Sequence, residues 1–135
     1  MSEKIQAIEG IGPHYAQILI NAGIRTTRDL LEAGAAPGGR QQLAEKTGIN
    51  EAMILKWVNM CDLFRIKGVG SQYAELLEAA GVDTVKELRN RNHENLAATM
   101  REVNSAKQLV RQVPAANRVA DWIDQARHLD PMISH

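Results

Sequence analysis

Two short stretches of this sequence carry glycines whose spacing can expose backbone amides to an anion. Residues 10–12 read Gly-Ile-Gly and residues 68–70 read Gly-Val-Gly, and a helical pattern follows each. The first amides of a helix have no acceptor within the helix, and its dipole adds partial positive charge there. We therefore expect the amides of residues 12–14 and 70–72 to hold a phosphate oxygen.

The charged residues next to these turns predict that the second turn is the better phosphate site. Lys67 precedes the second turn, whereas Glu9 has the matching place before the first and would repel an anion. His14 and Gln72 lie two positions after the second glycines, so neither position supplies a permanent positive charge. The electrostatic attraction at the turns themselves is therefore small.

Both turns belong to a longer stretch that occurs twice. Residues 8–30 and 66–88 align without a gap at an offset of 58, with ten identities in 23 positions, which indicates an internal duplication. The later part of each unit repeats more loosely, with Trp57 matching Trp122 at an offset of 65. The second unit has therefore gained about seven residues. Their place is ambiguous in the alignment, and the pairing of Leu43-Ala44 with Leu96-Ala97 would put them between residues 98 and 118.

Helix signals surround the turns, and nothing in the sequence is typical of a strand. Pro13 suits the first turn of a helix, and Ser71 is expected to cap the equivalent helix. Gly23 and Gly81 fall where a left-handed residue ends a helix. Short helices are then expected after two threonine caps, each completed by an acid three residues later in a capping box, namely Thr26 with Asp29 and Thr84 with Glu87.

The rest of the chain supplies connectors and core. A longer amphipathic helix is expected within residues 49–66, a glycine- and proline-rich connector over 33–42, and a helix break over 113–117. Trp57 and Trp122 have the spacing of core anchors, and the repeated Tyr15 and Tyr73 are expected to be half-buried.

Composition narrows the class of protein. Of 135 residues, 44% are apolar, and 16 basic side chains balance 16 acidic ones, so the chain is not generically basic. Residues 86–118 alone lean positive, with seven basic and three acidic side chains. Cys61 is the only cysteine and is expected to be a buried apolar residue. Without a membrane span or secretory signal, the chain is expected to be cytoplasmic.

No constellation predicts catalysis. The four histidines lack a metal-ligand spacing, and no Walker loop, dinucleotide fingerprint or nucleophile elbow is present. We expect a non-enzyme with no catalytic residue, no metal, no cofactor and no small-molecule substrate.

The turns resemble the helix-hairpin-helix motif, hydrophobic-x-Gly-hydrophobic-Gly-x-x-x-Ala-x-x-hydrophobic. Its positions are matched by Ile8, Gly10, Ile11, Gly12, Ala16 and Leu19, and again by Ile66, Gly68, Val69, Gly70, Ala74 and Leu77. Over essentially its full length the chain is similar to a tandem helix-hairpin-helix family, domain of unknown function four-three-three-two. Helix-hairpin-helix modules of DNA glycosylases, ligases and nucleases bind the nucleic-acid backbone, often with lysine or arginine where this chain has His14 and Gln72.

The resemblance implies an all-α fold of two pseudo-symmetric helix-hairpin-helix units, residues 1–65 and 66–135, packed into one compact helical body. It also implies sequence-independent binding of the DNA backbone. The residues expected to bind nucleic acid are Gly10, Gly12, Pro13, His14, Lys67, Gly68, Gly70, Ser71, Gln72 and Lys86. The alternative is a protein-interaction or scaffolding module without nucleic acid, favoured by the neutral charge and by Glu9 in the first loop.

Overall fold

The computed structural model describes residues 2–135, and the regular structure within them is helical. The only strand-like feature of these residues is an isolated bridge between Lys4 and Thr26, so the predicted all-α class is confirmed. A 3-10 helix η1 (Ile5–Ala7) is followed by α1 (Pro13–Asn21), α2 (Thr27–Gly34), α3 (Pro37–Thr47), α4 (Glu51–Leu63), α5 (Ser71–Ala79), α6 (Val85–Leu88), α7 (His93–Lys107) and α8 (Ala116–Arg127).

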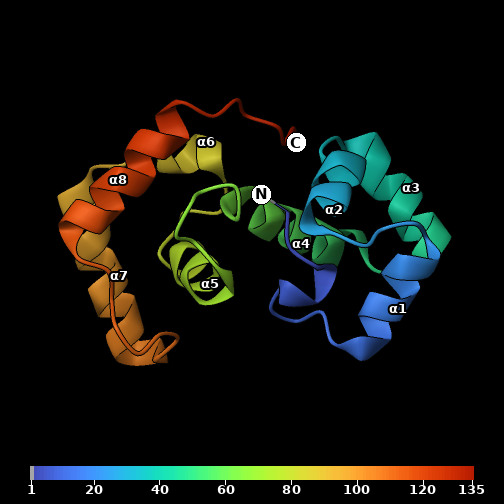
Figure 1. Cartoon of the computed structure of the whole chain (residues 1–135), viewed down its shortest axis with the longest axis horizontal. Coiled ribbons are helices and arrows are strands. Elements are labelled where there is room, and N and C mark those ends of the chain that lie inside the picture. Colours follow the sequence, from blue (N-terminus) through green and yellow to red (C-terminus); the bar gives the residue numbers. More distant parts are fainter. Residues whose placement is uncertain (1) are drawn as a thin grey trace.

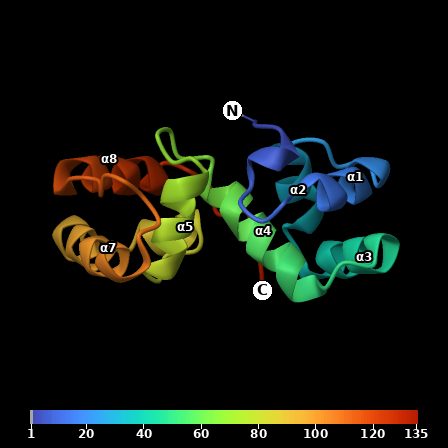
Figure 2. The ribbon, with the colours of Figure 1, turned by 90° about the horizontal axis from the view of Figure 1, so that it is seen from below.

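The helices form two groups that meet at α4 and α5. Helices α1 to α4 lie together on one side of the molecule and α5 to α8 on the other (Figure 1). Helix α2 packs on α3 and α4 in the first group, and α8 packs on α6 and α7 in the second. Figure 2 shows α4 running into α5 at the centre. The expected boundary at residues 65 and 66 falls in this connection, and the domain division and pseudo-symmetry remain predictions.

The core contains the repeated aromatic residues. Trp57 and Trp122 are only 2% and 1% exposed, which confirms them as core anchors. Half-buried Tyr15 lies with its ring centroid 5.2 Å from that of Trp57, and Tyr73 lies 5.3 Å from Trp122. These tyrosines therefore pack as expected, against the tryptophan of their own group.

One of the two expected capping boxes is complete and the other is only half formed. The Thr26 hydroxyl accepts a hydrogen bond from the Asp29 amide, and the Asp29 carboxylate accepts one from the Thr26 amide, both at 3.1 Å. Thr84 accepts from the Glu87 amide at 3.2 Å, but the Glu87 carboxylate turns to Arg91 instead. The second prediction was wrong in this respect, because a guanidinium competes for the carboxylate.

The predicted helix ends are confirmed at the glycines and revised at one connector. Gly23 and Gly81 have φ angles of +88° and +95° and follow α1 and α5. The connector expected at residues 33–42 is wrong: α2 continues to Gly34, and α3 begins at Pro37. The break over 113–117 agrees with the interval between α7 and α8.

The segment after α8 returns to the first group of helices, where the chain end lies close to α2 in Figure 1. Arg65 Nη2 donates to the Asp130 carbonyl at 2.8 Å, and Arg40 Nη2 donates to the Ser134 carbonyl at 2.8 Å. The Ser134 amide donates to the Ala35 carbonyl at 2.8 Å. Residues 130–134, called the strap below, therefore join the second group to the first.

The helices of residues 2–135 are all too short or too polar to cross a membrane. The longest, α7, has 15 residues and carries several charged side chains.

Candidate functional site

A tryptophan lies beneath the first glycine of each Gly-hydrophobic-Gly turn. Gly10 and Gly68 have φ angles of +93° and +98°, which side chains disfavour. A methyl group added to Gly10 would lie 3.6 Å from Trp57 Nε1, and one added to Gly68 would lie 3.2 Å from Trp122 Nε1. The positive φ therefore explains both glycines without a ligand, and at Gly68 the close approach of the indole adds a steric reason.

The second glycine of each turn is the N-cap of a nine-residue helix. The Gly12 carbonyl accepts from the Ala16 amide and the Gly70 carbonyl from the Ala74 amide, each at 2.9 Å. Within residues 2–135, the amides of residues 70–73 have no acceptor. The start of α5 thus has the free N–H groups that an anion requires.

The start of α1 is poorer in donors. Pro13 is the first residue of the helix and has no N–H, so the free amides of the described chain are those of Gly12, His14 and Tyr15. The expectation that residues 12–14 all present amides was therefore wrong at Pro13. Ser71 occupies the equivalent position in α5 and keeps its amide.

Ser71 does not cap α5 as predicted. Gly70 is the N-cap residue, and Ser71 is the first residue of the helix. The Ser71 hydroxyl oxygen is buried and has no partner among the described residues, while the Gln72 side chain is exposed. The hydroxyl cannot cap because it lies one position too late to reach the second or third amide of the helix.

Lys67 lies in a turn that α8 holds in place. The Lys67 amide donates to Gln125 Oε1 at 2.8 Å, and Gln125 Nε2 donates back to the Lys67 carbonyl at 3.1 Å. The residue itself is exposed. The paired hydrogen bonds fix the backbone of the loop and leave the ammonium group in solvent.

Arg118 is the second cation beside this turn. Its guanidinium carbon lies 5.1 Å from the Tyr73 ring centroid and 5.6 Å from that of Trp122. A methyl group added to Gly68 would lie 3.8 Å from Arg118 Nη2. Cation–π attraction to two rings holds the guanidinium on the Gly68 side of the turn.

The first turn lacks these cations. Glu9 is exposed in its loop. Arg118 lies four residues before Trp122, and the equivalent position, four residues before Trp57, is occupied by Met53. Met53 is 37% exposed. His14 is exposed with its ring 5.4 Å from that of Tyr15. The two turns therefore differ in local charge as well as in their free amides.

Lys86 is not part of either turn. It is exposed on α6 and lines a pocket of about 370 Å³ together with Asp62, Thr84 and residues 131–135. The pocket is lined by no residue of the turn at 68–70. Lys86 therefore lines a pocket of its own, and the turn itself contains Lys67 and residues 68–72.

Much of the positive window of residues 86–118 has other partners or positions. Arg91 donates to Glu87 at 3.0 Å and to the Gly81 carbonyl at 2.9 Å, so it secures the end of α5. Arg101, Lys107 and Arg111 are exposed on or after α7. Arg118 is the member of this window that contacts the second turn.

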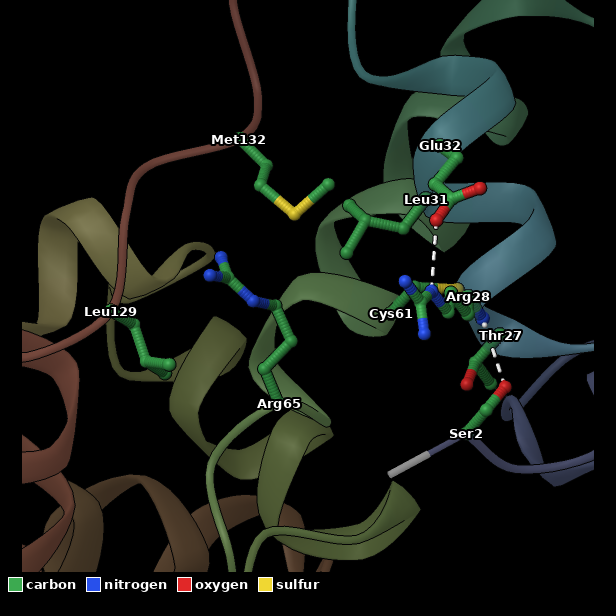
Figure 3. A pocket seen from close by; sticks show the side chains of 9 residues that line it. All are labelled: Ser2, Thr27, Arg28, Leu31, Glu32, Cys61, Arg65, Leu129 and Met132. Atoms are coloured by element: carbon green, nitrogen blue, oxygen red, sulfur yellow. Dashed lines mark hydrogen bonds and ion pairs between the residues drawn. The ribbon is translucent and has the colours of Figure 1, made fainter.

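A separate pocket of about 320 Å³ lies between α2, α4 and the strap (Figure 3). Arg65 extends between the side chains of Leu129 and Leu31, and Arg28 bonds to Glu32 at 2.8 Å. Cys61 also lines the pocket but is only 2% exposed. None of the predicted binding residues lines this pocket.

Cys61 is confirmed as a buried residue of α4. Burial raises the pKa of its thiol, and the charge of neighbouring Asp62 raises it further. The thiol therefore remains protonated at neutral pH, unlike an activated nucleophile. Residues 2–135 contain no group of three or more His, Cys, Asp or Glu side chains that could hold a metal ion.

Sequence reasoning did not single out Arg118 or Gln125. Arg118 appeared only within a charged window, and Gln125 had no assigned role. Both residues could have been identified from Trp122. Arg118 lies four residues before it and Gln125 three residues after it, so all three are on the same face of the helix. Once Trp122 is known to contact Gly68, its helical neighbours become candidates for the turn.

One comparison with known proteins gave a match. The family model described as "Domain of unknown function (DUF4332)" matches residues 9–129. No curated protein and no solved structure matched the chain. The match spans both turns and all eight α-helices.

Proposed function

The chain belongs to the DUF4332 family, and from this premise and its own geometry we propose that it binds the DNA backbone without catalysis and without reading base sequence. The binding groups are backbone amides and cations at the Gly-hydrophobic-Gly turns, and the second turn contributes most. Such groups contact phosphates, which are the same at every nucleotide, so base selectivity is not expected from them.

The observation that carries the proposal is the combination of donors and charge at the start of α5. The amides of residues 70–73 have no acceptor in the part of the chain that the structure describes, and exposed Lys67 and Arg118 flank the turn. A phosphate oxygen there would gain N–H donors, the positive end of the helix dipole and two cations. The helix-hairpin-helix spacing of both turns supports the same reading.

The first turn is proposed as an auxiliary contact. Its free amides at Gly12, His14 and Tyr15 could accept a second phosphate, but Glu9 opposes an anion. Affinity therefore depends chiefly on one site and is expected to be roughly 10⁻⁴ to 10⁻⁶ M, as for other binding without sequence specificity. A cytoplasmic location is part of this proposal.

A Gly70→Asp variant tests the proposal. A methyl group at Gly70 meets no atom within 4 Å and its φ is −101°, so a side chain fits there. Aspartate is a favoured N-cap residue, and its carboxylate would accept hydrogen bonds from the free amides in place of a phosphate. Anisotropy with a labelled duplex at low salt should show Kd raised on the order of tenfold.

Two controls make that experiment specific. Gly12 is equally open, so Gly12→Asp places the same charge at the auxiliary turn and should weaken binding much less. Gly70→Asn caps α5 without a charge and should weaken binding less than Gly70→Asp. No binding of duplex or single-stranded DNA by the wild-type protein at low salt, or equal binding by wild type and Gly70→Asp, would overturn the proposal.

The alternative is a protein-interaction module, which the zero net charge favours. In that case the two aspartate variants would leave DNA binding unchanged and abolish capture of a protein partner, with circular dichroism showing the fold intact. The DNA proposal is preferred because Arg118 and Lys67 gather at the turn that has the most free amides.

A further inference from the structure

A pocket lies beside the second turn. Its volume is about 370 Å³, and it is lined by Tyr73, residues 112–115, Asn117 and Arg118. The pairing of Leu43-Ala44 with Leu96-Ala97 would place the extra residues of the second unit between positions 98 and 118, an interval that includes the wall at 112–115. Tyr73 and Arg118 therefore lie at both the pocket and the proposed phosphate site.

Hydrogen bonds hold the pocket wall in place before any ligand arrives. Asn104 Nδ2 donates to the Val110 carbonyl at 3.0 Å, and the Val110 amide donates to Asn104 Oδ1 at 2.9 Å. The Tyr73 hydroxyl donates to the Gln112 carbonyl at 3.1 Å. Because Asn104 lies on α7 and Tyr73 on α5, the loop is fixed from two helices.

The lining of the pocket suits a flat heteroaromatic ring. Val113 and buried Pro114 supply apolar surface, and the exposed Arg118 guanidinium supplies a planar cation held over Tyr73 and Trp122. Nucleobases stack on aromatic rings and on guanidinium planes. The exposed Asn117 and Gln112 side chains add amide donors and acceptors for a base edge.

We propose that this pocket takes an unpaired base of single-stranded DNA whose phosphate binds the amides of α5. The inference rests on the proposed backbone binding and adds a ligand class to it. A paired base is stacked inside its duplex and cannot enter, so the pocket favours single strands. Its volume lies near the lower end of the ~300–1,000 Å³ range of ligand pockets, which is sufficient for one base.

Anisotropy at low salt with three probes of equal length tests this inference. The probes are a single strand, the same strand with abasic sites throughout, and its duplex. The single strand should bind about tenfold more tightly than the abasic strand, because stacking of one base on aromatic groups has an effect of this size. Equal Kd values for the single and abasic strands would overturn the inference.

An Ala115→Leu variant fills the pocket without changing charge. Ala115 is exposed and is the N-cap residue of α8, with an extended backbone. Its side chain forms no capping hydrogen bond, so a longer side chain is accommodated there. The variant should bind the single strand no better than wild type binds the abasic strand, with abasic and duplex affinities unchanged. Ala36→Leu, at the exposed extended N-cap of α3, is the matched control and should bind like wild type.

The outcomes separate the two proposals. If Ala115→Leu lowers the affinities for the abasic strand and the single strand equally, or lowers neither, the base pocket is wrong while backbone binding stands. If wild type binds none of the three probes, or Gly70→Asp leaves all three affinities unchanged, backbone binding fails and the base pocket fails with it.

Discussion

At the scale of single residues, Gly68 and Gly70 differ in what the fold requires of them. Gly68 combines a φ of +98° with close approach of the Trp122 indole, whereas Gly70 has an ordinary φ of −101° and open space around it. The fold therefore requires a glycine at position 68 but not at position 70. Gly70 is available to contact a ligand.

This difference predicts unequal costs of substitution by alanine. Gly68→Ala should lower the free energy of unfolding by about 1–3 kcal/mol, because alanine is strained at positive φ and its methyl group would crowd Trp122. Gly70→Ala should cost less, about 0.5–1 kcal/mol, because its backbone is unstrained but alanine is a poorer N-cap residue than glycine. Urea unfolding measures both, and equal stabilities of the two variants would contradict this assignment.

At the scale of elements, the two threonine caps are similar in sequence but not in bonding. The Asp29 carboxylate accepts from the amides of Arg25 at 3.0 Å and Thr26 at 3.1 Å. These hydrogen bonds, that from Arg25 foremost, lower the pKa of Asp29. Glu87 instead bonds to Arg91, so α6 has only the Thr84 half of its capping box.

We predict that Asp29→Asn costs about 1 kcal/mol of stability at pH 7, the usual size of a capping interaction. The folded-state pKa of Asp29 is lowered, so its contribution is present above the ordinary carboxyl pKa and is lost as pH falls through the lowered value. Urea unfolding of wild type and variant should therefore converge in acid. A difference that persists undiminished at pH 2 would contradict the capping role.

The element scale also shows where sequence patterns were sufficient. Gly23 and Gly81, Pro13 and the repeated tryptophans have local or periodic signals, and each has the predicted place. Gly34 and Gly39 were assigned to a connector but belong to helices. A methyl group on Gly34 would collide with Val58, and one on Gly39 with the Ala33 carbonyl, so tertiary packing selects these glycines.

The candidate site was predictable only in part for the same reason. The turn at Gly68 to Gln72 was evident from spacing, and the missing donor at Pro13 follows from residue type. Arg118 and the pocket wall at 112–115 come from a distant part of the sequence, so their position beside the turn depends on how α8 packs. Lys86 belongs to the repeated stretch 66–88 but lines a pocket to which the turn at 68–70 contributes no residue.

At the scale of the whole molecule, the strap joins the two groups of helices through buried arginine. Arg40 is only 5% exposed, and its guanidinium donates to the carbonyls of Gly34, Ala35 and Ser134 at 2.9, 3.1 and 2.8 Å. Arg65 bonds to buried Asp62 at 2.8 Å and to the Asp130 carbonyl. Contacts of this kind hold the position of one group relative to the other.

Arg40→Ala should therefore be strongly destabilising. It removes the donor to the Gly34 and Ser134 carbonyls, while the Ala35 carbonyl keeps the Ser134 amide. The link to the strap is weakened, and a loss of about 1–3 kcal/mol is expected from the unsatisfied groups. Arg28→Ala is the control, since the exposed Arg28 guanidinium forms a surface ion pair with Glu32, which contributes little to stability. If both variants unfold at the same urea concentration, the strap does not contribute to stability as argued.

The dependence of duplex binding on salt tests the central claim most directly. With Lys67 and Arg118 as the two phosphate-binding cations, the slope of log K against log salt should be about −2 for wild type and about −1 for Lys67→Ala, since each phosphate contact contributes ~0.9. Arg101→Ala, an exposed cation on α7, should keep the wild-type slope. An unchanged slope in Lys67→Ala, or affinity independent of salt, would contradict backbone binding at the second turn.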